Sequence, residues 1–418
     1  MEQIFMTNLT IEKVRHLKDI SIPLSDTQIR HLILTGKNGT GKTSVLEALA
    51  NYVDNAFSDR YFADRELWIN NAKKQRDAAI QNGQEEGEIA KLELELDKHK
   101  TQFIKSRSGL DICFNHKLNN IPALQEKHHY ILAYYRADRT FKAECPKHVE
   151  KVQLKDDYGL KEFPGNEFVK YLLDLKMTEA LARNNKKAEK ADKIHAWFKN
   201  FERLLKNIFA DESIELAFDE DTFAFHILQQ GKEPFDFNTL SSGYQAVLDI
   251  VLDVMMRMAN QTQRSFDFNL PGIVLIDEIE THLHLELQKD IMPLLTTIFP
   301  NIQFVVTTHS PFVLNSLGNV VIYDLENHLL VENGMNNLPY EGIVEGYFRA
   351  DRMSHTLKAN FERYKNLVQK EKLSDDEISE IAKLELYLDE IPDYLAIGIT
   401  TEYQRLKLEY MNREDIDG

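Results

Sequence analysis

Short apolar runs alternate with longer helical stretches along this chain, and the first of them lie near its start. Residues 9–14 and 20–24 alternate apolar and polar positions, and they predict an antiparallel hairpin within residues 4–23. Residues 32–34 are continuously apolar and predict a buried strand, and the apolar positions of residues 44–56 recur at helical spacing. A strand that runs directly into a helix favours an α/β fold.

The same alternation continues through the rest of the sequence. Further strands are predicted at 110–114, 129–135, 214–228, 272–276 and 302–308, and helices at 64–104, 166–209, 246–258 and over most of 336–418. The turn-prone residues 81–87 divide the 64–104 stretch in two, which predicts a helical hairpin, and its apolar positions keep no clean heptad repeat. Apolar stripes at this spacing in 166–209 are typical of core helices.

The junction of the first buried strand and its helix carries the clearest chemistry. Residues 36–43 fit the phosphate-binding pattern G-x-x-x-x-G-K-[ST], in which glycines let backbone N–H groups turn towards a triphosphate. In that pattern the lysine reaches the β- and γ-phosphates and the following hydroxyl ligates Mg²⁺. The predicted phosphate-binding residues are Gly36, Lys37, Asn38, Gly39, Thr40, Gly41, Lys42, Thr43 and Ser44.

Two later strands end in polar side chains that suit the same chemistry. The apolar run 272–276 delivers Asp277 and Glu278, which places one carboxylate to hold Mg²⁺ and the other to face an attacking water. The run 302–308 ends at His309, so we expect an imidazole at the same edge of the sheet.

A third motif precedes the predicted helix 246–258. Ser241, Ser242 and Gly243 offer free N–H groups at a helix start, where an anion is favoured. By itself this pattern is also that of an ordinary N-cap.

Charge restricts the partners of the chain. Fifty Lys and Arg residues against 67 Asp and Glu residues give a net charge of −17, so the average surface repels DNA, and any DNA contact requires a local patch. The densest basic cluster, at residues 186–193, alternates with acidic and small residues and is typical of a solvated helix face. The only cysteines, Cys113 and Cys145, lack metal-site spacing and predict two separate thiols.

No apolar run approaches the roughly 20 residues of a membrane helix, and the charged first 20 residues do not resemble a signal peptide. We therefore expect a cytoplasmic protein without membrane contact. After the strand at 129–135 come Arg136, Asp138 and Arg139, which lie either at the ligand edge of the sheet or in a surface salt bridge.

Taken together, the loop at 36–43, the segment 240–245, the acidic pair and His309 resemble the ABC-type ATPases, in the branch that contains the SMC, RecF and overcoming-lysogenisation-defect proteins. The segment 277–284 is especially similar to the last group. The resemblance implies a head-to-head dimer with ATP between the subunits. Lys42 and Thr43 would bind phosphate and Mg²⁺, residues 241–243 would close on the γ-phosphate of the partner, Asp277 would support Mg²⁺, Glu278 would polarise water and His309 would sense the γ-phosphate.

This chain departs from the family's Leu-Ser-Gly-Gly-Gln run, because Ser242 replaces the first glycine and Tyr244 precedes Gln245. Backbone N–H groups survive both changes, so we expect ATP binding to persist, while the contact made in trans is less closely specified. A glutamine-containing loop of the family has no clear counterpart, and residues 136–139 are the candidate for that region.

The resemblance divides the chain into an ABC-type P-loop NTPase head, of the α/β class, with helical additions. The expected segments are an ATPase lobe with the phosphate loop (1–63), a helical hairpin insertion (64–107), ATPase strands (108–148), a second helical insertion (149–210), an ATPase lobe with the cap, acidic pair and His309 (211–335) and a helical C-terminal extension (336–418).

The extension shows no nuclease motif, and this arrangement is similar to the ATPase subunits of two-gene antiphage systems such as PARIS and Septu. The resemblance implies a multimer, bound to ATP and Mg²⁺, that restrains a nuclease or toxin effector until a phage-derived trigger arrives. Two alternatives stay open: a RecF- or SMC-like ATPase acting directly on DNA, and the nucleotide subunit of a transporter. Salt-dependent duplex binding would favour the first, and copurification with a membrane protein the second.

Overall fold

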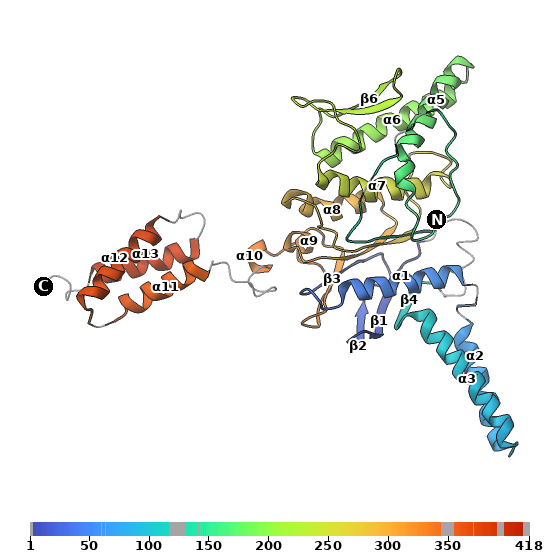
Figure 1. The fold of residues 1–418 in the computed structure, drawn as a ribbon, viewed down its shortest axis with the longest axis horizontal. Coiled ribbons are helices and arrows are strands. Elements are labelled where there is room, and N and C mark those ends of the chain that lie inside the picture. The colour runs from blue at the N-terminus through green and yellow to red at the C-terminus, as the bar shows by residue number, and fades with distance from the viewer. Residues whose placement is uncertain are drawn as a thin grey trace. The chain divides into compact units, whose positions relative to one another are not determined.

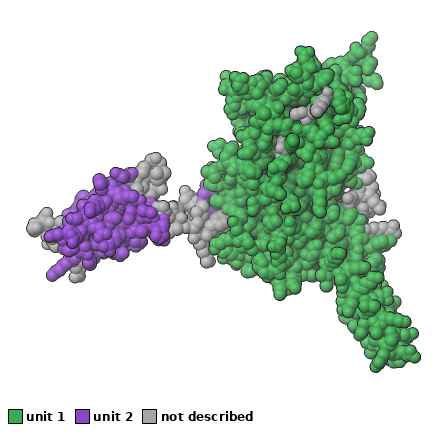
Figure 2. Space-filling model, viewed as in Figure 1, with its two compact units in different colours: residues 1–338 green, residues 339–418 purple. Residues whose placement is uncertain are grey.

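The chain divides into two compact units, residues 1–338 and residues 339–418 (Figure 2). The computed structural model describes residues 3–116, 130–343, 355–390 and 397–412, apart from residues 60, 63, 141, 145, 147 and 371. Cys145 lies outside the described residues, and so do residues 391–393, where the proline of an Ile-Pro-Asp sequence predicts a break between the last helices. Cys113 is a free, exposed thiol.

A six-stranded sheet forms the centre of the first unit, with the strand order β11-β10-β3-β9-β8-β5. Five of these strands run parallel, and β11 pairs with β10 in the antiparallel sense. The strands are β3 (His31–Thr35), β5 (Ile131–Tyr135), β8 (Gly272–Ile276), β9 (Ile302–Thr307), β10 (Val320–Asp324) and β11 (Leu329–Val331). Every residue of β3, β8 and β9 is buried, as expected for central strands of a parallel sheet.

Helices cover both faces of this sheet. Helix α1 (Lys42–Ser58) lies on one face, and α7 (Ser242–Ala259) and α8 (Leu285–Ile298) lie on the other (Figure 1). Val45 and Leu49 of α1 share one apolar cluster with Leu34 and Leu275 of the sheet. The short helix α9 (Pro311–Asn315) begins directly beyond His309, with Ser310 as its N-cap.

The predicted N-terminal hairpin belongs to a second sheet. Strand β1 (Met6–Val14) pairs antiparallel with β2 (Leu17–Pro23) and with β4 (Leu110–Phe114). The predicted helical hairpin is present as α2 (Arg65–Gln81) and α3 (Glu86–Arg107), which pack against each other (Figure 1). At its base, the amide of Asn55 in α1 donates a hydrogen bond of 3.0 Å to the carbonyl of Ser106.

The second predicted helical block also forms. It consists of the short 3₁₀ helix η2 (Pro164–Glu167), α5 (Phe168–Asn184) and α6 (Ala188–Phe209), and a two-stranded sheet follows, made of β6 (Glu215–Asp219) and β7 (Ala224–Leu228). The apolar stripe of α6 is buried against α5 through an aromatic cluster that includes Phe168, Trp197 and Phe201.

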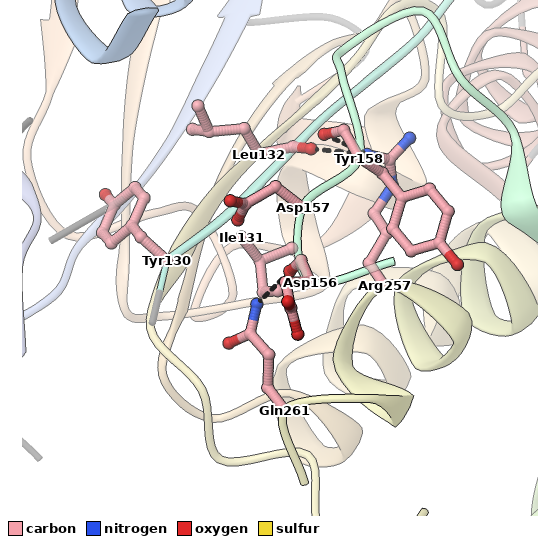
Figure 3. Close-up of a pocket in the computed structure, with 8 residues that line it drawn as sticks. All are labelled: Tyr130, Ile131, Leu132, Asp156, Asp157, Tyr158, Arg257 and Gln261. Atoms are coloured by element: carbon pink, nitrogen blue, oxygen red, sulfur yellow. Dashed lines mark hydrogen bonds between the residues drawn. The ribbon is translucent and has the colours of Figure 1, made fainter. Parts of the chain in front are cut away.

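A buried charge network ties α7 to the neighbouring strand and to the root of this block. Asp253 accepts hydrogen bonds from Tyr135 and from Arg257, both at 2.7 Å. The Arg257 guanidinium also donates to the carbonyls of Leu132 (2.9 Å) and Tyr158 (3.3 Å), in the small pocket drawn in Figure 3. Because the buried cation and carboxylate are paired and hydrogen-bonded, removing either partner would leave the other charge unpaired.

Where η2 meets α7 the two backbones are almost in contact. The N–H of Gly165 donates to Asp253 at 2.9 Å, and a Cβ atom at position 165 would lie 2.9 Å from the Cα of Asp253. No side chain fits in that space, which explains a glycine there.

The second unit is a small helical unit with its own core. Its described helices are α10 (Tyr340–Gly342), α11 (His355–Val368), α12 (Asp375–Asp389) and α13 (Ile397–Met411). Tyr364, Ile381 and Leu406 are fully or almost fully buried in one cluster. A capping box starts α12, since Ser374 and Glu377 exchange side-chain to backbone hydrogen bonds.

Candidate active site

The phosphate loop connects β3 to α1 at the carboxyl edge of the parallel sheet. Gly36, Gly39 and Gly41 have φ angles of +128°, +84° and +100°, a region that other residues rarely adopt. Gly41 is the N-cap of α1, and a Cβ there would approach the side chain of Leu17 to 3.0 Å. The loop therefore needs glycine for its backbone angles, and at Gly41 also for space.

Lys42 is buried beneath this loop. Its ammonium donates to the carbonyls of Gly36 (2.8 Å) and Lys37 (3.1 Å). Burial lowers the pKa of Lys42, and the carboxylates of Glu278, Glu280 and Asp277 oppose that effect. The side chain is thus a positive charge held inside the loop, where an anion enclosed by the loop would meet it.

Asp277 and Thr43 come together although 234 positions separate them in the chain. The Thr43 hydroxyl donates to Oδ1 of Asp277 at 3.2 Å, and the same oxygen accepts a 2.6 Å hydrogen bond from Thr307 of β9. A hydroxyl and a carboxylate are the oxygen donors that Mg²⁺ prefers. Across the described residues no group of three or more His, Cys, Asp and Glu side chains could hold a metal, so a cation here would take further oxygens from phosphate or water.

Glu278 turns away from the strand that delivers it. Its φ of +44° is left-handed, and its N–H donates to the Thr307 hydroxyl at 2.7 Å. Thr281 donates to the Glu278 carboxylate at 3.4 Å, and the carboxylate stays partly exposed. The Thr307 hydroxyl therefore contacts both acidic residues. It holds the Asp277 carboxylate towards the phosphate loop, and it holds the backbone of Glu278 where the turn begins.

His309 follows β9 at the same edge. Its backbone N–H donates to Glu280 at 2.5 Å, while its ring Nε2 is buried without a hydrogen-bond partner among the described residues. Burial lowers the pKa of His309, and the positive charge of Lys42 lowers it further. The carboxylates of Glu280, Glu278 and Asp277 oppose this shift. The free Nε2 of the ring is available to a phosphate oxygen.

The cap at residues 241–243 starts α7. Ser241 is the N-cap and has extended backbone angles, and both Ser241 and Ser242 are exposed. Gly243 is buried, and a Cβ there would lie 3.2 Å from the carbonyl of His282. The two serines face solvent at a helix N-terminus.

The departures from the usual cap motif have structural reasons. Tyr244 stacks on Phe209 with ring centroids 4.3 Å apart, so its ring packs on the α6 side of the cap. Gln245 donates to the carbonyl of Asn238 at 2.9 Å and thereby holds the loop that precedes the cap. Neither side chain covers the exposed serines.

The segment after β5 combines both interpretations left open by the sequence. Arg136 and Asp138 are exposed and form a surface ion pair at 3.3 Å. Arg139 is buried, and it donates a hydrogen bond to the carbonyl of Asp277 in the acidic segment, residues 277–280. Sequence reasoning did not distinguish the two arginines, because both follow the same apolar strand.

Other residues of the site gave no sequence signal. A groove beside the loop is lined by the β1–β2 turn and the residues after β10, namely His16, Leu17, Lys18, Leu325, Glu326 and His328, together with residues 37–40. Glu280 and Thr307 were likewise missed as site residues.

None of the helices that the structure describes has the length and apolar character needed to cross a bilayer.

Comparison with known proteins places this geometry in context. The Septu protein PtuA from Bacillus mycoides (strain KBAB4) is 31% identical over 224 residues, which are 50% of this chain and 29% of PtuA. The Retron Ec83 probable ATPase from Escherichia coli is 31% identical over 169 residues, 39% of this chain and 29% of that protein. Each alignment thus covers less than a third of the relative. The predicted resemblance to Septu ATPases is confirmed.

Among solved structures, the SMC head domain from Thermotoga maritima covers 76% of this chain and 94% of its own length, at 12% identity and a TM-score of 0.34. Residues 32–315 match the model of the family described as "AAA domain, putative AbiEii toxin, Type IV TA system". This segment is more than half of the 418 residues and contains the loop, the cap, the acidic pair and His309. The chain therefore belongs to this family of AAA-domain proteins.

Proposed function

We propose that this protein binds ATP with Mg²⁺, hydrolyses it at a site completed by a second copy, and acts as the ATPase subunit of a bacterial antiphage complex. The observation that carries the proposal is the convergence of Lys42, Thr43, Asp277, Glu278 and His309 at one edge of the sheet. A cation, a hydroxyl and carboxylates are groups that bind phosphate and Mg²⁺ and position water in phosphoryl transfer, and the imidazole lies beside them.

Each residue has a role that follows from its surroundings. The loop N–H groups and Lys42 bind the phosphates, and Thr43 and Asp277 would hold Mg²⁺, which when bound neutralises phosphate charge. Glu278, turned off the strand and partly exposed, orients the attacking water and accepts its proton. The free Nε2 of His309 contacts the γ-phosphate. The groove beside the loop is lined in part by His16, Leu17 and His328, and the nucleoside would pack against these side chains.

The exposed cap supports a site shared between two subunits. Ser241 and Ser242 present hydroxyls and N–H groups to solvent at the start of α7, and such a helix end favours an anion. In a head-to-head dimer the cap of one copy would close on the γ-phosphate held by the other. A monomer would then bind ATP and hydrolyse it slowly.

The defence role rests on the relatives. The Septu and retron proteins align with 50% and 39% of this chain, and we infer by analogy that the protein works with an effector nuclease or toxin and responds to a phage-derived trigger. The net charge of −17 disfavours the RecF-like alternative, in which the chain would act directly on DNA.

The proposal is tested by nucleotide titration, phosphate release and native mass of the full chain with Mg²⁺. ATP should bind, be hydrolysed slowly and shift the protein to a dimer or higher multimer. Lys42→Ala should weaken ATP binding by about 100-fold, because a buried cation facing the triphosphate is lost. Lys74→Ala is the matched control, since that lysine is exposed on α2, outside the phosphate loop and the groove beside it.

Unchanged ATP affinity in Lys42→Ala would refute the phosphate-loop assignment. Hydrolysis that rises several-fold on addition of duplex DNA at low salt would favour the DNA-directed alternative instead.

A further inference from the structure

One buried arginine, Arg139, contacts the acidic segment through its backbone carbonyls. Arg139 is 8% exposed and follows β5, the edge strand that pairs with β8. Its guanidinium donates to the carbonyl of Asp277 at 3.0 Å, to that of Ile279 at 3.2 Å and to that of Glu278 at 3.5 Å. A further hydrogen bond of 3.2 Å reaches the carbonyl of Arg136 in its own turn. Three consecutive carbonyls of the acidic segment thus face one cation.

These carbonyls need that cation because of the backbone angle at Glu278. A left-handed φ at a non-glycine residue is sterically disfavoured and persists only where its surroundings determine it. At this turn the carbonyls of Asp277 and Ile279 accept hydrogen bonds from Arg139, while that of Glu278 also accepts one of 3.0 Å from the N–H of Thr281. Buried carbonyls without donors are costly, and the planar fork of arginine supplies several donors in one fixed geometry.

Carboxylates of the acidic segment and of α7 surround the charge of Arg139. Burial lowers the pKa of Arg139, and Asp249, Glu280 and Asp277 oppose that effect, Asp249 most strongly. Asp249 is 6% exposed and lies on α7, the helix that begins with the cap. Arg139 therefore lies between the acidic segment and the helix that carries Ser241 and Ser242.

We propose that Arg139 is a positioning residue that holds the backbone of residues 277–279 in the turned conformation and thereby aims the Glu278 carboxylate at the attacking water. This inference depends on the proposed ATPase function and goes beyond it. Arg139 does not bind the nucleotide in this account, because its donors are directed to carbonyls of the protein.

The test compares Arg139→Met and Arg139→Lys with the wild-type full chain in steady-state hydrolysis and in ATP titration. A catalytic group displaced by about 1 Å costs on the order of 100-fold in rate. We expect Arg139→Met to lower kcat by about 10- to 100-fold while the ATP affinity stays within about threefold. Arg139→Lys keeps the charge but lacks the planar fork, so it should recover only part of the rate.

A double variant separates positioning from a general loss of structure. If Arg139 acts through Glu278, adding Arg139→Met to Glu278→Gln should slow hydrolysis no further, because the group it positions is already disabled. The matched control is Arg136→Met, which removes the neighbouring exposed arginine and should leave kcat unchanged.

Several results would overturn the inference: wild-type kcat in both Arg139 variants, a parallel collapse of ATP affinity and kcat, further slowing in the double variant, or failure of both variants to fold. Absence of hydrolysis in the wild-type chain would instead contradict the proposed function, so the two failures are distinguishable.

Discussion

The two halves of the proposed site differ in how completely one chain builds them. In the phosphate-loop half, Thr307 bridges Asp277 and Glu278, Thr43 reaches Asp277, and Lys42 is enclosed by loop carbonyls. In the cap half, Ser241 and Ser242 are exposed, and neither packing nor a side-chain hydrogen bond caps the helix there. Lys42 and Asp277 of the first half have hydrogen-bond partners within the chain, and the two serines of the second half face water.

This difference indicates where binding energy is available. A group already hydrogen-bonded within its own chain must exchange partners to bind a ligand, whereas an exposed helix N-terminus gives up only water. The loop half can therefore be assembled before nucleotide arrives, and the cap half can respond to a nucleotide held by another copy. Three experiments test this difference between the loop half and the cap half.

The largest expected effect is on catalysis in the loop half. Glu278→Gln removes the proton acceptor and keeps the shape, so hydrolysis should fall by about 10²- to 10⁴-fold while ATP still binds. ATP-bound closed dimers should accumulate and be visible by native mass. Glu286→Gln, in the exposed first turn of α8, is the control. Full-rate hydrolysis by Glu278→Gln would remove this carboxylate from the mechanism.

A mixing experiment tests whether the cap works in trans. Ser242→Glu puts a carboxylate where the triphosphate of a partner would arrive, and an acidic residue at a helix start does not weaken the helix. Ser242→Glu and Lys42→Ala should each be inactive alone. An equimolar mixture should recover about a quarter of the wild-type rate, because half of the random dimers are mixed and each has one intact site.

The control mixture pairs Lys42→Ala with Glu278→Gln. Both residues belong to the loop half of one chain, so every site in a mixed dimer keeps one defect and no activity should return. Recovery in this mixture, or none in the first, would show that the halves are not divided between subunits as proposed.

The smallest effect concerns the stability of the loop half. His31 begins β3, is buried, and accepts a 3.1 Å hydrogen bond from the N–H of Phe304, and burial lowers its pKa from 6.5 to about 4. Below pH 6.5 His31 is protonated in the unfolded chain but stays neutral in the folded chain until the pH approaches 4. The free energy of unfolding therefore decreases as the pH falls through this range. The decrease should be about 1.5 kcal/mol between pH 6.5 and pH 5.

Urea unfolding at both pH values would measure this, with His31→Gln as the comparison. The variant should have a flatter pH dependence, and equal slopes for both proteins would contradict the role of His31.

Much of the site could be predicted from sequence because its motifs are local. Residues 36–43 carry their glycines and lysine within one turn, and Asp277, Glu278 and His309 each follow an apolar strand whose end defines the sheet edge. Arg139, Glu280 and Thr307 could not be assigned, because their roles depend on which strands are neighbours and on the backbone turn at Glu278.

The fold was predictable to a similar extent. Element types followed from the periodicity, including the α2–α3 hairpin and the α5–α6 block. The separation of β1, β2 and β4 into their own sheet was not, because strand pairing over about 100 residues leaves no local pattern.

Gly165 has a consequence for protein engineering. The backbone of η2 rests on Asp253 without room for a methyl group, and Asp253 is itself part of the ion pair with Arg257. Chimeras between homologues should therefore be joined within this block, at the turn between α5 and α6, where residues 184–188 are exposed. A splice at the root would have to transplant the glycine, the aspartate and the arginine as one inseparable set.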